Sequence, residues 1–224
     1  MGDGRVVRAV LLDLYDTLVW TEWPRLRELI EDQEGVSRVD LLAAFDRTRA
    51  ERSVGAFGSM EGDFRAVLEA AGVQGAGERA RSLAKVATSF LEDGVHLWED
   101  SLPVLRELRA RGIGTAIVSN CDHGTRPVVE RLGLDAETDA VVLSFEAGVA
   151  KPDAGIYRIA LDALGAREEE AVFVDDQARY CDGAAALGIG TFIVLRHDAA
   201  PGEGVSRPGG HAVLRDLRSL LDVL

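Results

Sequence analysis

The chain has 224 residues, of which 47% are hydrophobic and 28% are charged. This composition is typical of a folded protein with one large domain, or with a core and a smaller insertion. Its formal net charge of −13 repels phosphate backbones, so nucleic acid is not an expected partner.

Membrane and secretory segments are also not expected. No apolar run approaches the roughly 20 residues that span a bilayer, and the first residues, MGDGR, lack the apolar core of a signal peptide. Cys121 and Cys181 are the two cysteines, and we expect free thiols in a reducing compartment. These features predict a cytoplasmic protein, and nothing in the sequence indicates its oligomeric state.

The first expected element is a strand near residues 6–12. This run is rich in Val and Leu, as buried strands of parallel sheets are, and it ends at Asp13. A carboxylate there would lie at the carboxyl edge of the sheet, where open α/β folds bind ligands. The pattern from 19 to 94 is helical only, with helices expected at 25–33, 37–53 (capped by Ser37), 60–71 and 78–92.

From residue 98 onward, helices and strands alternate. Strands are expected at 113–118, 140–143, 171–174 and 189–195, and helices at 99–111, 125–132, 153–164 and 179–187. A mobile loop at 198–210 and a final helix at 213–224 complete the pattern. Such alternation predicts right-handed β-α-β units and a five-stranded parallel sheet, with the helical stretch as a separate subdomain above the strand ends.

Four of the expected strands are followed by polar residues, which parallel strands bring together at one edge. A carboxylate can act as a covalent nucleophile, a lysine can offset charge on the attacked group, and paired carboxylates can hold Mg²⁺. This set indicates phosphoryl transfer or metal-assisted chemistry. Its members are Asp13, Ser119, Asn120, Lys151, Asp175 and Asp176.

The motifs resemble those of the haloacid dehalogenase-like (HAD) superfamily, in the branch with a helical cap inserted after the first strand. The resemblance covers nearly the whole chain. It implies a Rossmann-like α/β core of strand order 5-4-1-2-3 at residues 1–18 and 95–224, with a helical cap at 19–94. The matching motifs are Asp13-Leu14-Tyr15-Asp16-Thr17, Val118-Ser119-Asn120, Lys151-Pro152-Asp153 and Val174-Asp175-Asp176.

The resemblance also implies a role for each matching residue. Asp13 would be the nucleophile that forms an aspartyl intermediate, and Lys151 would steady the charge. Thr17 and Ser119 would hydrogen-bond the transferred group, and Asn120 and Tyr15 would line the substrate site. Mg²⁺ would be held by Asp13, the Tyr15 backbone carbonyl and Asp176, with Asp175 as a further candidate that could equally cap the next helix.

Tyr15 departs from the phosphatases of this family, which carry an aspartate acid/base two residues after the nucleophile. A tyrosine, with an ordinary pKa near 10, is a poor base at neutral pH. Three interpretations follow. In the first, the protein is a Mg²⁺-dependent phosphatase whose acid/base comes from elsewhere in the chain or is weak. In the second it is a 2-haloacid dehalogenase, and in the third it binds a phosphorylated ligand with little turnover. The dehalogenase motif has a tyrosine at this position, and Tyr157 also resembles the dehalogenase pattern.

The acidic pair favours the phosphatase interpretation. Dehalogenases of the family need no metal and carry Ser and Asn in the fourth motif, whereas Asp175 and Asp176 would repel an anionic substrate unless Mg²⁺ neutralises them. We therefore expect hydrolysis of a small, anionic phosphate ester. The roles of other residues are less specific. His123 is expected to be a solvated loop residue, and Trp20 and Trp23 could line the pocket or pack between cap and core. One of Arg47, Arg49 and Arg52 could reach the substrate.

Overall fold

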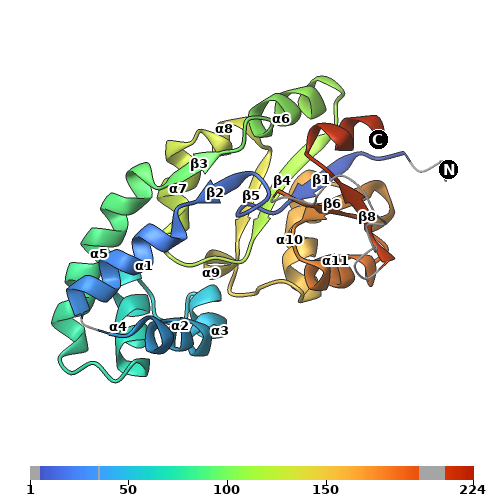
Figure 1. Ribbon diagram of the computed structural model, residues 1–224. Helices are drawn as coiled ribbons and strands as arrows, with labels where there is room; N and C mark the ends of the chain where they lie inside the picture. The colour runs from blue at the N-terminus through green and yellow to red at the C-terminus, as the bar shows by residue number, and fades with distance from the viewer. Residues whose placement is uncertain (1–5, 35, 197–209) are drawn as a thin grey trace.

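A parallel six-stranded sheet forms the centre of the computed structural model, which describes residues 6–34, 36–196 and 210–224 (Figure 1). The strand order within these residues is β5-β4-β1-β6-β7-β8. The five expected strands therefore occur in the expected order, 5-4-1-2-3, and β8 adds a sixth. The strands are β1 (Ala9–Leu12), β4 (Gly114–Ser119), β5 (Ala140–Leu143), β6 (Ala171–Asp175), β7 (Gly190–Val194) and β8 (Ala212–Leu214).

Strand β1 lies between β4 and β6, and its four residues are completely buried. Its side chains alternate between the two faces of the sheet. Val10 and Leu12 belong to one apolar cluster, and Ala9 and Leu11 belong to another. Burial on both faces explains the unbroken apolar run in the sequence.

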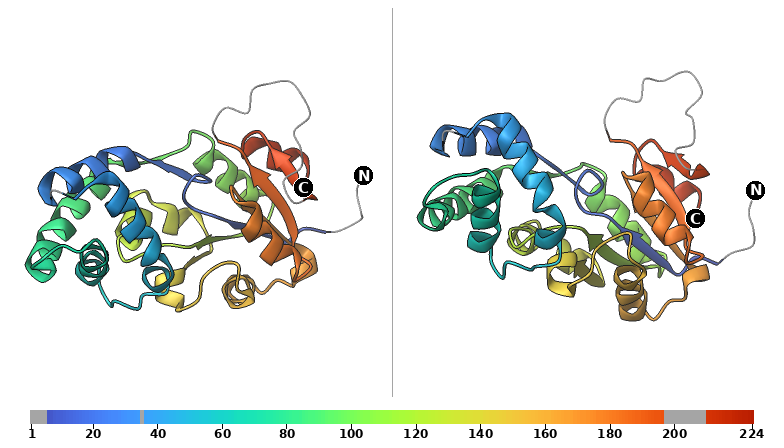
Figure 2. Two further views of the ribbon diagram at one scale, coloured as in Figure 1. Left: turned by 60° about the horizontal axis from the view of Figure 1, so that its bottom comes forward. Right: turned by 90° about the horizontal axis from the view of Figure 1, so that it is seen from below.

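Helices cover both faces of the sheet and make a three-layer core (Figure 2). The first apolar cluster includes residues of α6, α7 and α8, and the second includes residues of α10 and α11. A short helix, α9, follows β5. The bounds are α6 (Ser101–Ala110), α7 (Thr125–Arg131), α8 (Leu134–Glu137), α9 (Ser144–Ala147), α10 (Ala154–Leu164) and α11 (Ala178–Ala185).

Five helices lie between residues 23 and 93 of the described chain, and four of them share an apolar cluster of their own, which includes Leu26, Leu41, Phe64 and Phe90. Figure 1 shows this helical unit beside the carboxyl ends of the strands. Ser37 caps α2 as expected, by accepting a hydrogen bond from the Asp40 N–H. The cap boundaries 19–94 remain a prediction. The helices are α1 (Trp23–Glu34), α2 (Arg38–Arg47), α3 (Arg49–Ser53), α4 (Met60–Ala70) and α5 (Ala76–Asp93).

The chain enters and leaves the helical unit through a two-stranded antiparallel ribbon. It consists of β2 (Val19–Thr21) and β3 (Val95–Leu97). The expectation that residues 19–94 contain no strand is therefore wrong at its first three residues. The reason is that β2 depends on a partner more than 70 positions away, which a local pattern cannot reveal. Trp20 stacks on His96 in this ribbon, with ring centroids 4.2 Å apart.

The expected final helix at 213–224 is also wrong. Val213 and Leu214 extend the sheet by pairing with β7, and a 3-10 helix (Arg218–Asp222) follows. Leu217 and Leu220 are buried in the core, so the apolar spacing reflects packing rather than a full α-helix. The expected loop at 198–210 lies, apart from Gly210, outside the described residues. Within those residues, none of the helices combines the length and apolarity needed to cross a membrane.

Candidate active site

Asp13, Lys151 and Asp175 form a buried charge network at the carboxyl edge of the sheet. Lys151 Nζ donates to Asp13 Oδ1 at 2.6 Å and to Asp175 Oδ2 at 2.7 Å. The lysine side chain is completely buried, and so is Asp175. Residues separated by as many as 138 positions thus meet where β1 and β6 end, as the sequence predicts.

Lys151 is held in place through its backbone as well as through its charge. Asn120 forms two hydrogen bonds with it: the Lys151 N–H donates to Asn120 Oδ1 at 2.7 Å, and Asn120 Nδ2 donates to the Lys151 carbonyl at 2.8 Å. The side chain of Asn120, expected to contact the substrate, is therefore engaged with the lysine loop.

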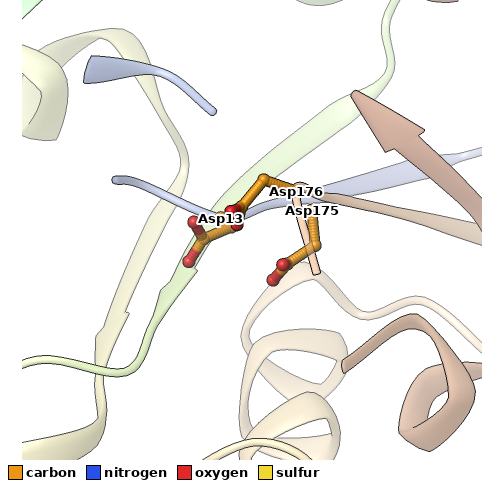
Figure 3. Close-up of side chains that lie close together, drawn as sticks. All are labelled: Asp13, Asp175 and Asp176. Carbon is orange, nitrogen blue, oxygen red and sulfur yellow. The ribbon is translucent and has the colours of Figure 1, made fainter. Parts of the chain in front are cut away.

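Three carboxylates gather at this edge, those of Asp13, Asp175 and Asp176 (Figure 3). One oxygen from each lies within 4.8 Å of the others. Burial, with the negative charge of Asp175, raises the pKa of both Asp13 and Asp176. Burial alone lowers the pKa of Lys151, but the charges of its two carboxylate partners outweigh this effect and raise it. The lysine therefore stays protonated beside its partners.

Three polar atoms around the network are buried and have no hydrogen-bond partner among the described residues. They are Thr17 Oγ1, Ser119 Oγ and Asp176 Oδ1. Leaving such atoms unsatisfied costs about 1–3 kcal/mol each. These atoms are the ones that a bound cation and an anionic substrate group would satisfy.

The donor set fits Mg²⁺, which prefers carboxylate and carbonyl oxygens. Asp175 is engaged on both oxygens, since Oδ1 accepts the Gln177 N–H at 2.7 Å while Oδ2 accepts Lys151. Asp13 and Asp176 have carboxylate oxygens with fewer hydrogen bonds, which could bind the cation. The hydrogen bonds that close the turn after Asp13 use the carbonyls of Leu14 and Val19 rather than that of Tyr15. Through this bond to Gln177, the residue just before α11, Asp175 also fixes the turn into that helix, and its role as a metal ligand remains a prediction.

The surroundings of the Tyr15 side chain do not favour a role for its hydroxyl in proton transfer. Its hydroxyl oxygen lies 3.1 Å from Thr125 Oγ1, in a hydrogen bond that either hydroxyl can donate. Its ring contacts Trp23 with centroids 5.7 Å apart. Burial raises the pKa of Tyr15 far above its ordinary value, so the phenol stays protonated.

A cleft of about 900 Å³ opens above Asp13, between the sheet edge and the helical unit. Tyr15, Asn120 and Lys151 line the core side. The opposite wall is largely apolar and comes from α1 and α2, through Trp23, Leu26, Ile30, Leu42 and Phe45. Trp23 thus lines the pocket, whereas Trp20 belongs to the β2–β3 ribbon.

The loop after β4 ties the core to the helical unit. Arg52 Nη1 donates to Asp122 at 2.7 Å, and His123 Nδ1 lies 2.7 Å from Asp63 Oδ2. His123 is therefore a half-buried contact residue, and the expectation of a solvated loop histidine is wrong. The reason is that Asp63, its partner, lies on α4, 60 positions earlier in the chain.

A buried ion pair that was not expected from the sequence holds the turn after β1. Arg196, just after β7, donates from Nε to the Thr17 carbonyl at 3.0 Å and from Nη1 to Asp100 Oδ2 at 2.9 Å. Arg196 and Asp100 are nearly completely buried. A lone arginine after a strand could have suggested this role, but its two partners are distant in sequence. This ion pair holds the turn that carries Thr17.

The strand order and the side chains at the strand ends place the protein among α/β enzymes that work at a sheet edge. A family model described as haloacid dehalogenase-like hydrolase matches residues 7–188. The match covers most of the chain, and the protein therefore belongs to this family of hydrolases.

Phosphoglycolate phosphatase of Rhodospirillum rubrum is 31% identical over 230 residues, covering 97% of this chain and 90% of that protein. An L-2-haloacid dehalogenase of Xanthobacter autotrophicus with covalently bound chloropropionic acid has a TM-score of 0.69 at 19% identity, covering 97% of this chain and 98% of that one. A HAD family enzyme of Bacteroides thetaiotaomicron, in complex with magnesium and inorganic phosphate, has a TM-score of 0.68 at 20% identity, covering 90% and 98%.

The two structural likenesses establish a shared fold. Several other curated relatives match over a smaller part of their length: the chain spans between 45% and 58% of them.

Proposed function

We propose that the protein hydrolyses small phosphate monoesters through a covalent aspartyl-phosphate on Asp13. The observation that carries this proposal is the trio of Asp13, Asp175 and Asp176 beside Lys151, in which Asp13 and Asp175 are buried and Asp176 is half-buried. Three carboxylates facing one ammonium leave an excess of negative charge, which suits a site that also takes a divalent cation. The 31% identity to a phosphoglycolate phosphatase over nearly the whole chain supports the same activity.

In this proposal an Asp13 oxygen attacks phosphorus, the ester P–O bond breaks, and the leaving oxygen takes a proton from water. A second water then attacks the aspartyl-phosphate, which releases phosphate and regenerates the Asp13 carboxylate. Lys151 keeps Asp13 oriented and offsets charge on the phosphoryl group. The hydroxyls of Thr17 and Ser119, which have no partner among the described residues, donate to phosphoryl oxygens.

The metal would be Mg²⁺, held by Asp13, Asp176 and the Tyr15 carbonyl, with Asp175 orienting Lys151. Once bound, it would neutralise charge on the carboxylates and on the phosphoryl oxygens.

The test is phosphate release from p-nitrophenyl phosphate, 2-phosphoglycolate, phosphoserine and a panel of sugar and nucleotide phosphates. Each reaction is run with Mg²⁺ and again with EDTA. We expect release that requires Mg²⁺ on at least one ester. The absence of Mg²⁺-dependent release from every ester would contradict the proposal.

The dehalogenase alternative is favoured by one observation, the tyrosine at position 15. It predicts halide release from L-2-chloropropionate in the presence of EDTA. Tyr157, the second feature of that pattern, is completely buried and donates its hydroxyl to the Tyr180 carbonyl at 2.7 Å. Its place in the core is therefore explained by packing, which leaves Tyr15 as the observation in favour.

We predict that Tyr15→Phe keeps the phosphatase rate within about threefold of the wild-type rate, because the phenol does not transfer the proton. The variant should lose about 1 kcal/mol of unfolding free energy, the typical value of one hydrogen bond. Steady-state kinetics and urea denaturation measure the two effects. Thr125→Val removes the other hydroxyl of the same hydrogen bond and is the matched control.

A rate loss of more than about tenfold in Tyr15→Phe alone would show that the phenol takes part in the reaction. Tyr15→Asp tests the reverse change, since it introduces the carboxyl that other phosphatases of the family carry. We expect a gain of about 10²-fold with alkyl phosphates, whose leaving oxygens most need a proton.

A further inference from the structure

Arg27 places a cationic side chain in the wall of the active-site cleft. The residue lies on α1 and is half-buried. Its Nε atom is buried and has no hydrogen-bond partner among the described residues, and Arg27 lines the same cleft as Asp13 and Lys151. An arginine nitrogen is costly to bury without an acceptor, so its position indicates a missing anionic group.

The other arginines that line the cleft already have partners. Arg52 is nearly buried and is committed to the contact between the helical unit and the core, and Arg49 is exposed. Arg179 packs against an aromatic ring. Arg27 is therefore the cleft arginine that remains without a partner in the described part of the chain. The partners are Asp46 for Arg49, Asp122 for Arg52 and Tyr180 for Arg179.

Arg27 lies one helical turn from a residue that packs at the reacting end of the cleft. Trp23 touches the ring of Tyr15, two residues after Asp13. Arg27 follows Trp23 by four positions, one helical turn or about 6 Å along the same face of α1. Leu26 and Ile30, its neighbours on the cleft wall, lower the local polarity and strengthen any ion pair made there.

We propose that Arg27 binds a second anionic group of the substrate, a carboxylate or another phosphate on the leaving group. The inference rests on the proposed phosphatase activity and narrows its substrates to phosphate monoesters with two anionic ends. One end lies at Asp13, and the planar guanidinium holds the other through two parallel N–H···O hydrogen bonds.

The first experiment compares Arg27→Gln with Arg25→Gln, a matched control on the same helix. Arg25 faces outward and pairs with Glu22 and Asp93. Substrates with a second anion (2-phosphoglycolate, phosphoserine, glycerate 2,3-bisphosphate) are compared with p-nitrophenyl phosphate, which has none. We expect Arg27→Gln to lower kcat/KM about 10- to 100-fold on the first group and to leave the last within about threefold. The carboxylated and the doubly phosphorylated esters distinguish the two sources of the second anion.

A second experiment needs no turnover. Calorimetry on the Mg²⁺-loaded protein measures binding of phosphonoacetate, which carries a phosphonate and a carboxylate, and of methylphosphonate, which lacks the carboxylate. Arg27→Gln should weaken phosphonoacetate binding about tenfold or more and leave methylphosphonate unchanged. Arg25→Gln should change neither.

Equal losses on both groups of substrates, or unchanged phosphonoacetate binding, would overturn the assignment of Arg27 while leaving the phosphatase proposal intact. Binding of phosphonoacetate that depends on Arg27, in a protein that hydrolyses none of the esters, would support the anion site and reject the phosphatase proposal. If the wild-type protein binds neither phosphonate, the anion site is rejected whether or not any ester is hydrolysed.

Discussion

Asp13→Asn is expected to lower the phosphatase rate by about 10⁴-fold or more, because an amide cannot form the aspartyl-phosphate. The replacement keeps the shape of the side chain, and its Oδ1 can still accept the hydrogen bond from Lys151 Nζ, which lies 2.6 Å from the present carboxylate. Burial and neighbouring carboxylates raise the pKa of Asp13, so removing this charge relieves repulsion in the metal-free protein. The thermal unfolding midpoint without Mg²⁺ should therefore not fall.

Single-turnover kinetics and thermal unfolding with and without Mg²⁺ check this prediction. Mg²⁺ should stabilise the wild-type protein more than Asp13→Asn, since the variant has lost one anionic oxygen ligand. Intact-mass measurement checks that the new asparagine has not deamidated back to aspartate. Asp135→Asn, an exposed change on α8, is the control. A rate within about tenfold of the wild-type rate would show that Asp13 is not the nucleophile.

Lys151→Met is expected to have the largest effect on stability, a loss of about 3–5 kcal/mol of unfolding free energy. The substitution removes the ammonium that lies between two buried carboxylates and leaves them without their cation. The phosphatase rate should also fall, by about 10²- to 10³-fold, because the charge facing the phosphoryl group is lost.

Urea denaturation at equilibrium measures the stability loss. Lys85→Met removes the only other lysine, an exposed residue of α5, and should change stability by less than about 0.5 kcal/mol. Adding Asp175→Asn to Lys151→Met should recover part of the loss, since it removes one of the stranded charges. If the double variant loses the sum of the two single effects, the lysine and Asp175 are not energetically coupled and the ion pair is not the cause.

The parallel core could be predicted because its signals are local. Burial on both faces makes β1 a continuous apolar run, and alternation with helices implies parallel strands. The same logic brought Asp13, Lys151 and Asp175 together, since the carboxyl ends of parallel strands converge at one edge. The resemblance to a known family supplied the strand order and the individual roles.

The errors share a cause, which is dependence on distant partners. Residues 19–21 and 212–214 are strands because β3 and β7 pair with them, and no local pattern encodes that pairing. Likewise, the sequence pattern drew attention to Arg47, Arg49 and Arg52, whereas Arg27 is the cleft arginine without a partner among the residues that the structure describes. Whether an arginine has a partner depends on what folds against it.

By itself, the sequence determined the α/β class and the carboxylate at the end of the first strand, which follow from residue type and short-range periodicity. The resemblance to the family showed that the tyrosine two residues later is unusual. Only the tertiary structure decided that Asn120 holds the lysine loop, that the Tyr15 hydroxyl is bonded to Thr125, and that three polar atoms around Asp13 lack partners among the described residues. Hydrogen bonding and desolvation depend on neighbours brought together by folding, and so they cannot be read from the order of residues along the chain.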